Sequence, residues 1–309
     1  MNLKKPKFWD YKKPNIYSFL LWPISILIKG INFLKKKSKK INLKIKTICV
    51  GNIYLGGTGK TSLSIKINSI LNKKNIKSCF IKKDYVNQLD EQRLLQSRGK
   101  LFLYKKRYQA LKNAIKDNYQ IAIFDDGLQD YSINYDICFV CFNDLNWIGN
   151  GMTIPSGPLR ESLNVLKKYK HVFLNGNSNN LKNIKDHILK INPKIDIFTG
   201  EYIPLNLNNF DLNDKYIAFS GIGNHQTFIS MIKNYGMNII KDIEFPDHYK
   251  FNDKDINKIL SISEKLNCKV ITTEKDYFRL KTTKINQINF IKSDLYISDE
   301  DKLIDAITN

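Results

Sequence analysis

Apolar and polar positions follow two alternating patterns along most of the chain. From residue 46 onward, short apolar runs that suit buried strands alternate with longer stretches in which apolar residues recur at helical spacing. This alternation is typical of an α/β protein with a largely parallel sheet. It predicts strands at residues 46–50, 120–124, 137–142 and 171–174, and in a second unit at 216–219, 239–245 and 269–272.

The region between residues 175 and 211 interrupts this pattern. Residues 175–192 are polar and rich in asparagine, and residues 195–211, which contain Gly200 and Pro204, are expected to be a connection. A second α/β unit then begins with a strand, a glycine-containing turn at 220–224 and helices at 225–235 and 253–266. The pattern therefore predicts three parts: an N-terminal segment at 1–45, a larger sheet domain at 46–205 and a smaller α/β domain at 206–309.

The N-terminal segment has a composition of its own. Between Lys13 and Lys29 the chain is uncharged and mostly apolar, with Trp22 and Pro23 near its centre and lysines clustered on both flanks. It is shorter than the roughly 20 residues that a membrane-spanning helix needs. A helix of this kind suits the interface of an anionic membrane leaflet, and the alternative is a helix packed on the body of the protein.

The net charge is strongly positive, +21, from 50 lysines and arginines against 29 acidic residues. Such an excess suggests an anionic partner: nucleic acid, an anionic membrane or a phosphorylated substrate. Lysine, isoleucine and asparagine are abundant throughout, however, so charge alone does not choose between these partners. The odd number of cysteines, 5, favours a reducing compartment, and Cys138 and Cys141 lie in an apolar run that predicts a buried strand rather than a metal or redox site.

The clearest chemical signal is the run Gly56-Gly57-Thr58-Gly59-Lys60-Thr61, which lies between the expected strand at 46–50 and a helical pattern. Glycines allow backbone N–H groups to converge on an anion at the start of a helix. Lys60 adds a charge that reaches the β- and γ-phosphates, and the Thr61 hydroxyl suits Mg²⁺. The run predicts a P-loop that binds ATP and Mg²⁺, so the larger domain is expected to be P-loop NTPase-like. A plain glycine-rich turn is the alternative.

A second signal is the pair Asp125 and Asp126, which ends the apolar run at residues 121–124. In P-loop proteins a second strand delivers an aspartate to the bound Mg²⁺. Two adjacent aspartates in a turn can also be a solvated cap. Downstream of a P-loop, the metal role is favoured, with Asp125, Asp126 and Thr61 as the predicted metal site.

Further motifs along the chain are more specific than these two signals. They are Asp-Asp-Gly-Leu-Gln at 125–129, Gly-Asn-Gly at 149–151, Gly-Pro-Leu-Arg-Glu at 157–161, Ser-Gly-Ile-Gly-Asn at 220–224, Phe-Pro-Asp-His at 245–248 and Thr-Thr-Glu-Lys-Asp-Tyr-Phe-Arg-Leu at 272–280. Together with the P-loop run, this set resembles the tetraacyldisaccharide 4′-kinase family, the inner-membrane kinases of lipid A synthesis. The matches follow the family order from about residue 50 to residue 280.

The resemblance implies a reaction and a location. ATP would phosphorylate the 4′-hydroxyl of a tetraacylated glucosamine disaccharide 1-phosphate, giving lipid IVA in lipid A synthesis. The protein would be peripheral on the cytoplasmic face of the bacterial inner membrane, anchored by an N-terminal membrane-associated helix. Its partners would be the lipid disaccharide and the anionic membrane surface, with no nucleic acid expected.

The resemblance also implies roles for individual residues. Lys60 would be catalytic as well as phosphate-binding, and Arg160 and Glu161 would lie close to the nucleotide. Asp90 would act as a catalytic base in a dyad with His248. From the residues alone, a carboxylate and a histidine are suitable in kind to accept a hydroxyl proton, but the sequence does not pair them.

Some positions depart from the family pattern. The family usually has Ser-Arg-Gly-Tyr-Gly-Gly after its second strand, whereas residues 81–89 are short and free of glycine here, and Gln92 and Asp130 replace a usual proline and histidine. The shortened loop predicts altered contacts to the lipid or altered loop closure. The alternatives to the kinase are a P-loop NTPase acting on a protein or nucleic-acid partner, and a homologue that binds nucleotide and membrane without catalysis. The motifs at 157–161 and 245–248 favour the kinase.

Overall fold

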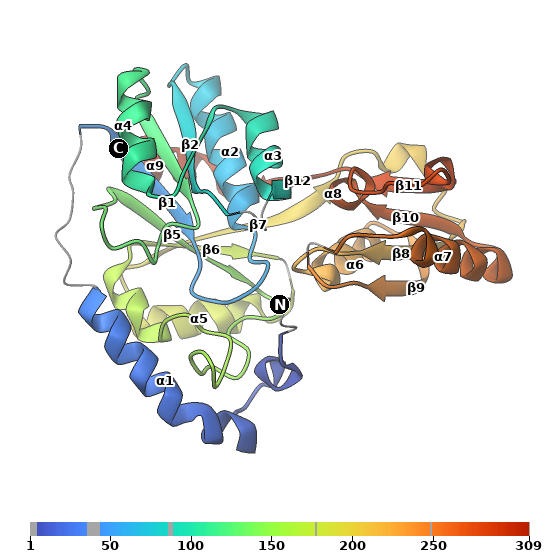
Figure 1. The fold of residues 1–309 in the computed structure, drawn as a ribbon, viewed down its shortest axis with the longest axis horizontal. Coiled ribbons are helices and arrows are strands. Elements are labelled where there is room, and N and C mark those ends of the chain that lie inside the picture. The colour runs from blue at the N-terminus through green and yellow to red at the C-terminus, as the bar shows by residue number, and fades with distance from the viewer. Residues whose placement is uncertain (1–4, 36–43, 86–88, 177, 248, 309) are drawn as a thin grey trace. The chain divides into compact units, whose positions relative to one another are not determined.

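The computed structural model describes residues 5–35, 44–85, 89–176, 178–247 and 249–308, without the side chains at 32–35 and 90 (Figure 1). The chain forms two compact units, Met1–Gly200 with Ile297–Asn309, and Glu201–Tyr296. In place of the single boundary expected after residue 205, the chain crosses between the units twice, within β7 (Asp196–Pro204) and within β12 (Ser293–Ile297). The last residues return to the larger unit because β12 pairs with β7.

The larger unit is built on an eight-stranded sheet in the order β12-β7-β6-β5-β1-β4-β2-β3. Parallel pairing joins β1 to β4 and β5, β2 to β3 and β4, and β6 to β5 and β7. The prediction of an α/β fold with a largely parallel sheet is therefore confirmed. Besides β7 and β12, its strands are β1 (Lys46–Gly51), β2 (Ser78–Lys83), β3 (Leu101–Tyr104), β4 (Ile121–Asp125), β5 (Ile137–Asn143) and β6 (His171–Asn175).

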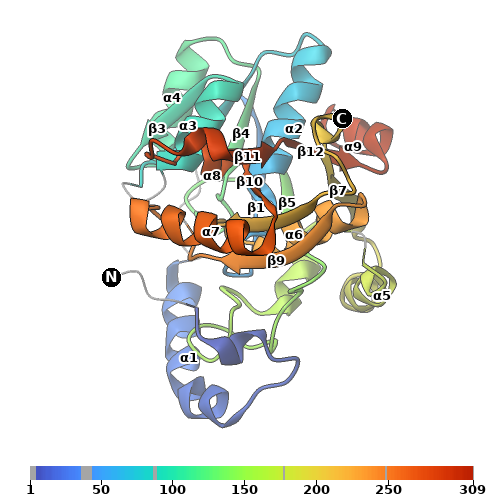
Figure 2. The same cartoon turned by 90° about the vertical axis from the view of Figure 1, so that its right-hand side faces the viewer.

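Helices cover both faces of this sheet (Figures 1 and 2). α4 (Arg107–Lys116) and α5 (Leu181–Ile191) pack on one face, in a core with alternate strand residues such as Cys49 and Phe124. α2 (Lys60–Lys73) and α9 (Glu300–Thr308) lie on the other face, joined by a 2.9 Å ion pair between Lys66 and Glu300. α3 (Leu89–Arg98) packs beside α2 and β3. A 3₁₀ helix, η3 (Leu163–Lys168), precedes β6.

The smaller unit has a four-stranded parallel sheet in the order β11-β10-β8-β9 (Figure 1). Its strands are β8 (Lys215–Ser220), β9 (Asn238–Glu244), β10 (Lys269–Thr273) and β11 (Ile288–Ile291). α6 (His225–Asn234) packs into the core on one face and α7 (Asp253–Leu266) into the core on the other. Short helices complete the unit: η4 (Leu207–Asn209), α8 (Glu274–Tyr277) and η5 (Ile285–Gln287).

The interval between residues 175 and 211 differs from its prediction. The expected connection contains the nine-residue strand β7, which pairs with β6 from His171 opposite Asp196 to Asn175 opposite Gly200. The polar stretch before it contains α5, whose Ile184 and Ile188 are buried in the core and whose Leu181 and Ile191 pack against it. These apolar residues recur at helical spacing, but the surrounding asparagines and lysines make the segment read as polar overall.

The N-terminal helix α1 (Ile16–Lys35) is packed with its polar side inward. Ser18 and Ser25 are buried, whereas Leu20 and Leu27 are each 68% exposed. Ser18 Oγ accepts a 2.9 Å hydrogen bond from Asn150 Nδ2, and Ser25 Oγ lies 2.8 Å from Ser156 Oγ. In the part of the chain that the structure describes, no helix combines the length and the hydropathy needed to cross a membrane. The 3₁₀ helix η1 (Lys7–Asp10) precedes α1.

Candidate active site

The P-loop lies between β1 and α2, as the sequence predicts. Gly59 takes the left-handed conformation with φ 83° as the N-cap of α2, and a Cβ at this position would come within 2.8 Å of Asn175 Nδ2. Glycine is therefore required for two reasons, its dihedral angle and the space available. Lys60 and Thr61 form the first turn of α2, where unpaired backbone N–H groups and the helix dipole favour an anion.

The loop is braced by buried polar contacts. Asn52, which is fully buried, donates from Nδ2 to Thr58 Oγ1 at 2.9 Å and to the carbonyl oxygen of Gly56 at 3.2 Å. The Leu55 N–H donates to the carbonyl oxygen of Pro158 at 2.8 Å, next to the bridge between Tyr54 and Leu159. The segment at residues 157–161 therefore runs directly beside the P-loop and supports it.

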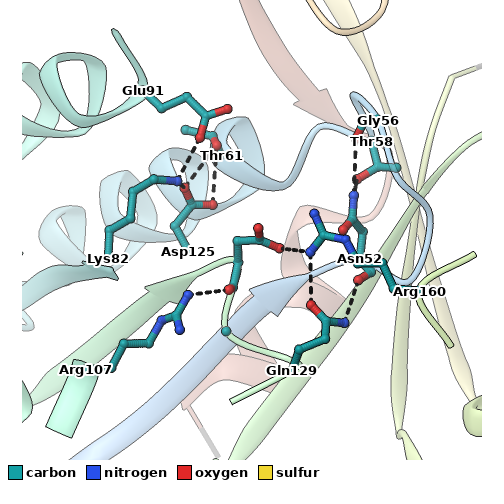
Figure 3. A network of polar contacts seen from close by, with 12 residues as sticks. Asn52, Gly56, Thr58, Thr61, Lys82, Glu91, Arg107, Asp125, Gln129 and Arg160 are labelled. Atoms are coloured by element: carbon teal, nitrogen blue, oxygen red, sulfur yellow. Dashed lines mark hydrogen bonds and ion pairs between the residues drawn. The ribbon is translucent and has the colours of Figure 1, made fainter. Parts of the chain in front are cut away.

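Asp125 ends β4 beside the P-loop helix (Figure 3). Its side chain is fully buried and accepts a 3.1 Å hydrogen bond from Thr61 Oγ1. Hydroxyl and carboxylate oxygens are the ligands that Mg²⁺ prefers, and Mg²⁺ is usually held by one or two such groups together with substrate phosphates. Thr61 and Asp125 therefore fit a Mg²⁺ that also binds the phosphates of a nucleotide.

Asp126 has a different partner from Asp125. With φ 59° it adopts the left-handed conformation, and its Oδ1 accepts a 2.8 Å hydrogen bond from Arg160 Nη1. Burial by itself raises the pKa of Asp126, but the positive charges of Lys60 and Arg160 outweigh burial and lower the pKa to about 2. Asp126 is thus a permanent negative charge that orients Arg160.

Two further side chains, Gln129 and Arg107, bind beside the contact between Arg160 and Asp126. Gln129 accepts from Arg160 Nη1 at 2.9 Å and donates from Nε2 to the carbonyl oxygen of Asn52 at 3.0 Å. Arg107 Nη2 donates to the carbonyl oxygen of Asp126 at 2.6 Å. Both sides of the turn after β4 are therefore fixed by hydrogen bonds.

Glu161 is buried, with 7% of its surface exposed. Burial and the adjacent Glu161 carboxylate together raise the pKa of Tyr131. Whereas Arg160 reaches Asp126, Glu161 is directed to Tyr131, so the two neighbouring residues act on different parts of the site.

In the smaller unit, three motifs meet at the carboxyl ends of β8, β9 and β10. The Gly221 N–H donates to Asp276 Oδ2 at 2.9 Å, and the Gly221 carbonyl oxygen accepts from Arg279 Nη1 at 3.0 Å. The Phe245 N–H donates to the carbonyl oxygen of Ser220 at 2.8 Å. The chain before position 248 is therefore anchored to the turn at 220–224, and that turn is held by the motif at 272–280.

The two members of the expected base dyad are not both described. His248 lies outside the described residues, and Asp90 is described by its backbone, which forms the first turn of α3. Their roles stay predictions.

The comparisons with known proteins identify the family. The family model for tetraacyldisaccharide-1-P 4′-kinase matches residues 17–309. The chain belongs to this family. It is 57% identical to the tetraacyldisaccharide 4′-kinase of Pelagibacter ubique (strain HTCC1062) over 307 residues, which cover 99% of this chain and 98% of that protein. It is 33% identical to the enzyme of the same name from Rickettsia akari (strain Hartford), covering 99% and 97%.

The fold of the family is confirmed by a solved structure. The apo form of LpxK from Aquifex aeolicus, crystallised in complex with ATP, matches with a TM-score of 0.66 and 21% sequence identity, covering 94% of this chain and 98% of that one. The likeness extends over both units of the chain. The α/β architecture expected from the sequence is therefore that of the tetraacyldisaccharide 4′-kinases.

One residue of the candidate site in this member of the 4′-kinase family was not predicted from the sequence. Lys82 is 1% exposed and forms ion pairs with Asp125 Oδ2 at 2.5 Å and Glu91 Oε2 at 2.7 Å (Figure 3). Burial alone lowers the pKa of Lys82, but Asp125 and Glu91 outweigh it and raise the pKa, so the ammonium stays charged. In the sequence Lys82 is the first of two adjacent lysines after an apolar run, which gives no signal for a site. Gln129, by contrast, lies in a recognised motif.

Proposed function

We propose that this chain is an ATP-dependent kinase that phosphorylates the 4′-hydroxyl of a tetraacylated glucosamine disaccharide 1-phosphate, giving lipid IVA. Membership of the 4′-kinase family supports this reaction. The observation that carries it is the contact between Arg160 and Asp126, because it builds a motif of this family into the P-loop site. A general P-loop NTPase has no need for that motif.

The nucleotide side of the reaction uses the P-loop. Backbone N–H groups at Gly56, Gly57, Thr58 and Gly59 bind phosphate oxygens, and Lys60 places its ammonium against the β- and γ-phosphates. Thr61 and Asp125 would hold Mg²⁺, which would neutralise charge on the phosphate oxygens. Arg160 adds a second cation that Asp126 and Gln129 hold in one orientation, and the Asp126 carboxylate would add negative charge to the metal site.

The acceptor side uses Asp90 and His248 as the resemblance assigns them. Asp90 takes the proton from the 4′-hydroxyl as the new O–P bond forms and the bond from the γ-phosphorus to the β–γ bridging oxygen breaks. His248 would act with Asp90 as a dyad and tune its basicity, as the resemblance implies. Glu161 supports the nucleotide site from the Tyr131 side.

The lipid substrate implies that the protein works at a membrane. The exposed leucines of α1 and Trp22, which is 50% exposed, form an apolar face. Because the serines on the other side of the helix are buried, this face is directed away from the protein. Lysines flank this helix on both sides and favour an anionic surface. We infer peripheral attachment to the cytoplasmic face of the bacterial inner membrane, with no role for nucleic acid.

One assay tests the reaction. The full-length protein is incubated with γ-labelled ATP, Mg²⁺ and tetraacyldisaccharide 1-phosphate in detergent micelles, and the label is followed into the lipid phase. The proposal expects a labelled lipid whose new phosphate is at the 4′ position. Label that is released only as inorganic phosphate, at a rate independent of the lipid, would support the NTPase alternative.

A further inference from the structure

Lys82 lies at the carboxyl end of β2, next to Asp125 at the carboxyl end of β4. The two strands pair in parallel with Ile81 opposite Phe124, so the next residue on each strand, Lys82 and Asp125, points to the same face of the sheet. This is the face covered by α2. The Lys82 ammonium is therefore placed by the strand register rather than by a flexible loop.

The ammonium connects the two sides of the proposed reaction. One of its partners, Asp125, accepts from Thr61 at the start of α2. Its other partner, Glu91, is in the first turn of α3 and directly follows Asp90 in the sequence. Figure 3 shows the Lys82 ammonium in contact with both carboxylates, and Thr61 in contact with Asp125. A buried lysine with two buried or half-buried carboxylate partners is costly to assemble, so its position calls for a role.

We propose that Lys82 is a positioning residue for the phosphoryl transfer, an internal cation that holds the Asp125 carboxylate beside Thr61 and, through Glu91, fixes the start of the helix that carries Asp90. This inference rests on the proposed kinase function. It assigns Lys82 no contact with the substrate.

The arrangement has a consequence for metal binding. A Mg²⁺ bound at Asp125 would share that carboxylate with Lys82, so the lysine offsets part of the charge that would otherwise attract the metal. Removing the ammonium leaves Asp125 with more uncompensated charge. Nucleotide binding should then depend more strongly on Mg²⁺, while phosphoryl transfer should become slower because α3 loses its link to β4. A residue with only a general structural role would weaken both properties together.

The test uses Lys82→Met, which removes the charge at similar length, and Lys82→Gln, which keeps a hydrogen-bonding group. Lys66→Met is the matched control, because Lys66 forms its ion pair with Glu300 on α9, away from the site. The first readout is the ratio of the ADP dissociation constant in EDTA to that in Mg²⁺, measured by calorimetry on the full-length protein. The second is kcat with the lipid acceptor, separated from the KM for ATP.

We expect the metal-dependence ratio to rise about tenfold in both Lys82 variants and to stay unchanged in Lys66→Met. We expect kcat to fall by about tenfold or more, with a smaller change in the KM for ATP. An unchanged ratio in both Lys82 variants, or an equal change in the control, overturns the proposal. So does a failure of both variants to fold, because the lysine would then be required for folding rather than for positioning.

The outcome is separable from that of the kinase proposal. The ADP ratio needs no lipid, so it reports on Lys82 and Asp125 even if the wild-type protein forms no labelled lipid. In that case the kinase function fails, and the link between Lys82 and the metal is still decided. If the wild-type protein phosphorylates the lipid and the ratio does not move, only the role of Lys82 is wrong.

Discussion

Arg160 donates to Asp126 Oδ1 at 2.8 Å, and this contact between residues 34 positions apart joins two sequence motifs. The same guanidinium nitrogen reaches Gln129 at 2.9 Å. Since Asp126 and Gln129 both lie in the turn after β4, the position of Arg160 is determined by the strand that also carries Asp125. The contact therefore fixes the Arg160 guanidinium relative to Asp125, the proposed metal ligand.

The low pKa of Asp126 predicts a pH-dependent contribution to stability. Its pKa is about 2 in the folded protein, against an ordinary value of 3.8, so the ionised carboxylate stabilises the fold above the ordinary value and this stabilisation is lost as the pH falls toward 2. We expect Asp126→Asn to lower the free energy of unfolding by roughly 2 kcal/mol at pH 6, and the difference to shrink at low pH. Urea unfolding at pH 6, 4 and 2.5 measures it. The same pH dependence in the exposed control Asp117→Asn would contradict the prediction.

The P-loop lysine is expected to be essential for transfer. Lys60→Ala removes the charge that follows the γ-phosphate into the transition state, so kcat should fall by about 10²–10³ or more. Asp125→Ala should act in the same direction through lost Mg²⁺. Lys66→Ala, later on the same helix, is the control and should retain activity. Turnover within a few-fold of wild type in Lys60→Ala would remove the P-loop assignment.

The exposed face of α1 predicts membrane binding. Leu20→Asp combined with Leu27→Asp should weaken binding to anionic vesicles by at least about tenfold, because each buried leucine contributes about 1.5–3 kcal/mol. High salt should weaken binding of the wild-type protein only in part, since salt screens lysine attraction and leaves apolar burial in place. Vesicle co-sedimentation measures both effects. Leu205→Asp, at another exposed leucine, should bind normally, and deletion of residues 1–40 should release the protein.

The proposed catalytic dyad of Asp90 and His248 predicts that the kinetic effects of substituting the two residues are not additive. Asp90→Ala should lower kcat by about 10²–10⁴ while ATP binding survives, because phosphoryl transfer depends chiefly on positioning. His248→Ala should also lower kcat, and the double variant should lose less than the product of the two single losses, as expected for residues that act as a unit. Single-turnover transfer with saturating ATP gives these values. Independent, multiplying losses would argue against a dyad.

The buried carboxylate of Asp276 is expected to stabilise the smaller unit. It accepts from the Gly221 N–H and from Thr273 Oγ1, each at 2.9 Å, and pairs with Arg279 at 3.0 Å. Asp276→Ala removes these contacts and should lower the free energy of unfolding by about 3 kcal/mol. Chemical denaturation measures the change. A loss no larger than that of Asp253→Ala, an exposed position at the start of α7, would show that the contacts contribute little.

The sequence predicts the parts of the fold that depend on local patterns. Most of the strongly apolar strands and both predicted helices of the smaller unit lie within one or two residues of their expected positions, because their apolar residues repeat at the strand or helix period. It misses β7 and α5, whose apolar positions lie among polar residues, and it gives no strand at β2, β3 or β11. It also misses the return of β12 to the large sheet, because a strand sequence does not specify which sheet it joins.

In the candidate site, the phosphate loop, the aspartates after β4 and the family motifs can be identified from the sequence, because each depends on residues adjacent in the chain. Which side chains meet depends on the packing of segments that lie far apart in the chain. The register of β2 and β4 places Lys82 against Asp125, and the bridge at Leu159 brings Arg160 to Asp126. The burial of Ser18 and Ser25 in α1 also depends on the tertiary structure, because their partners lie in residues 150–156, more than a hundred positions away. Contacts of that kind depend on strand order and packing, which no local pattern encodes.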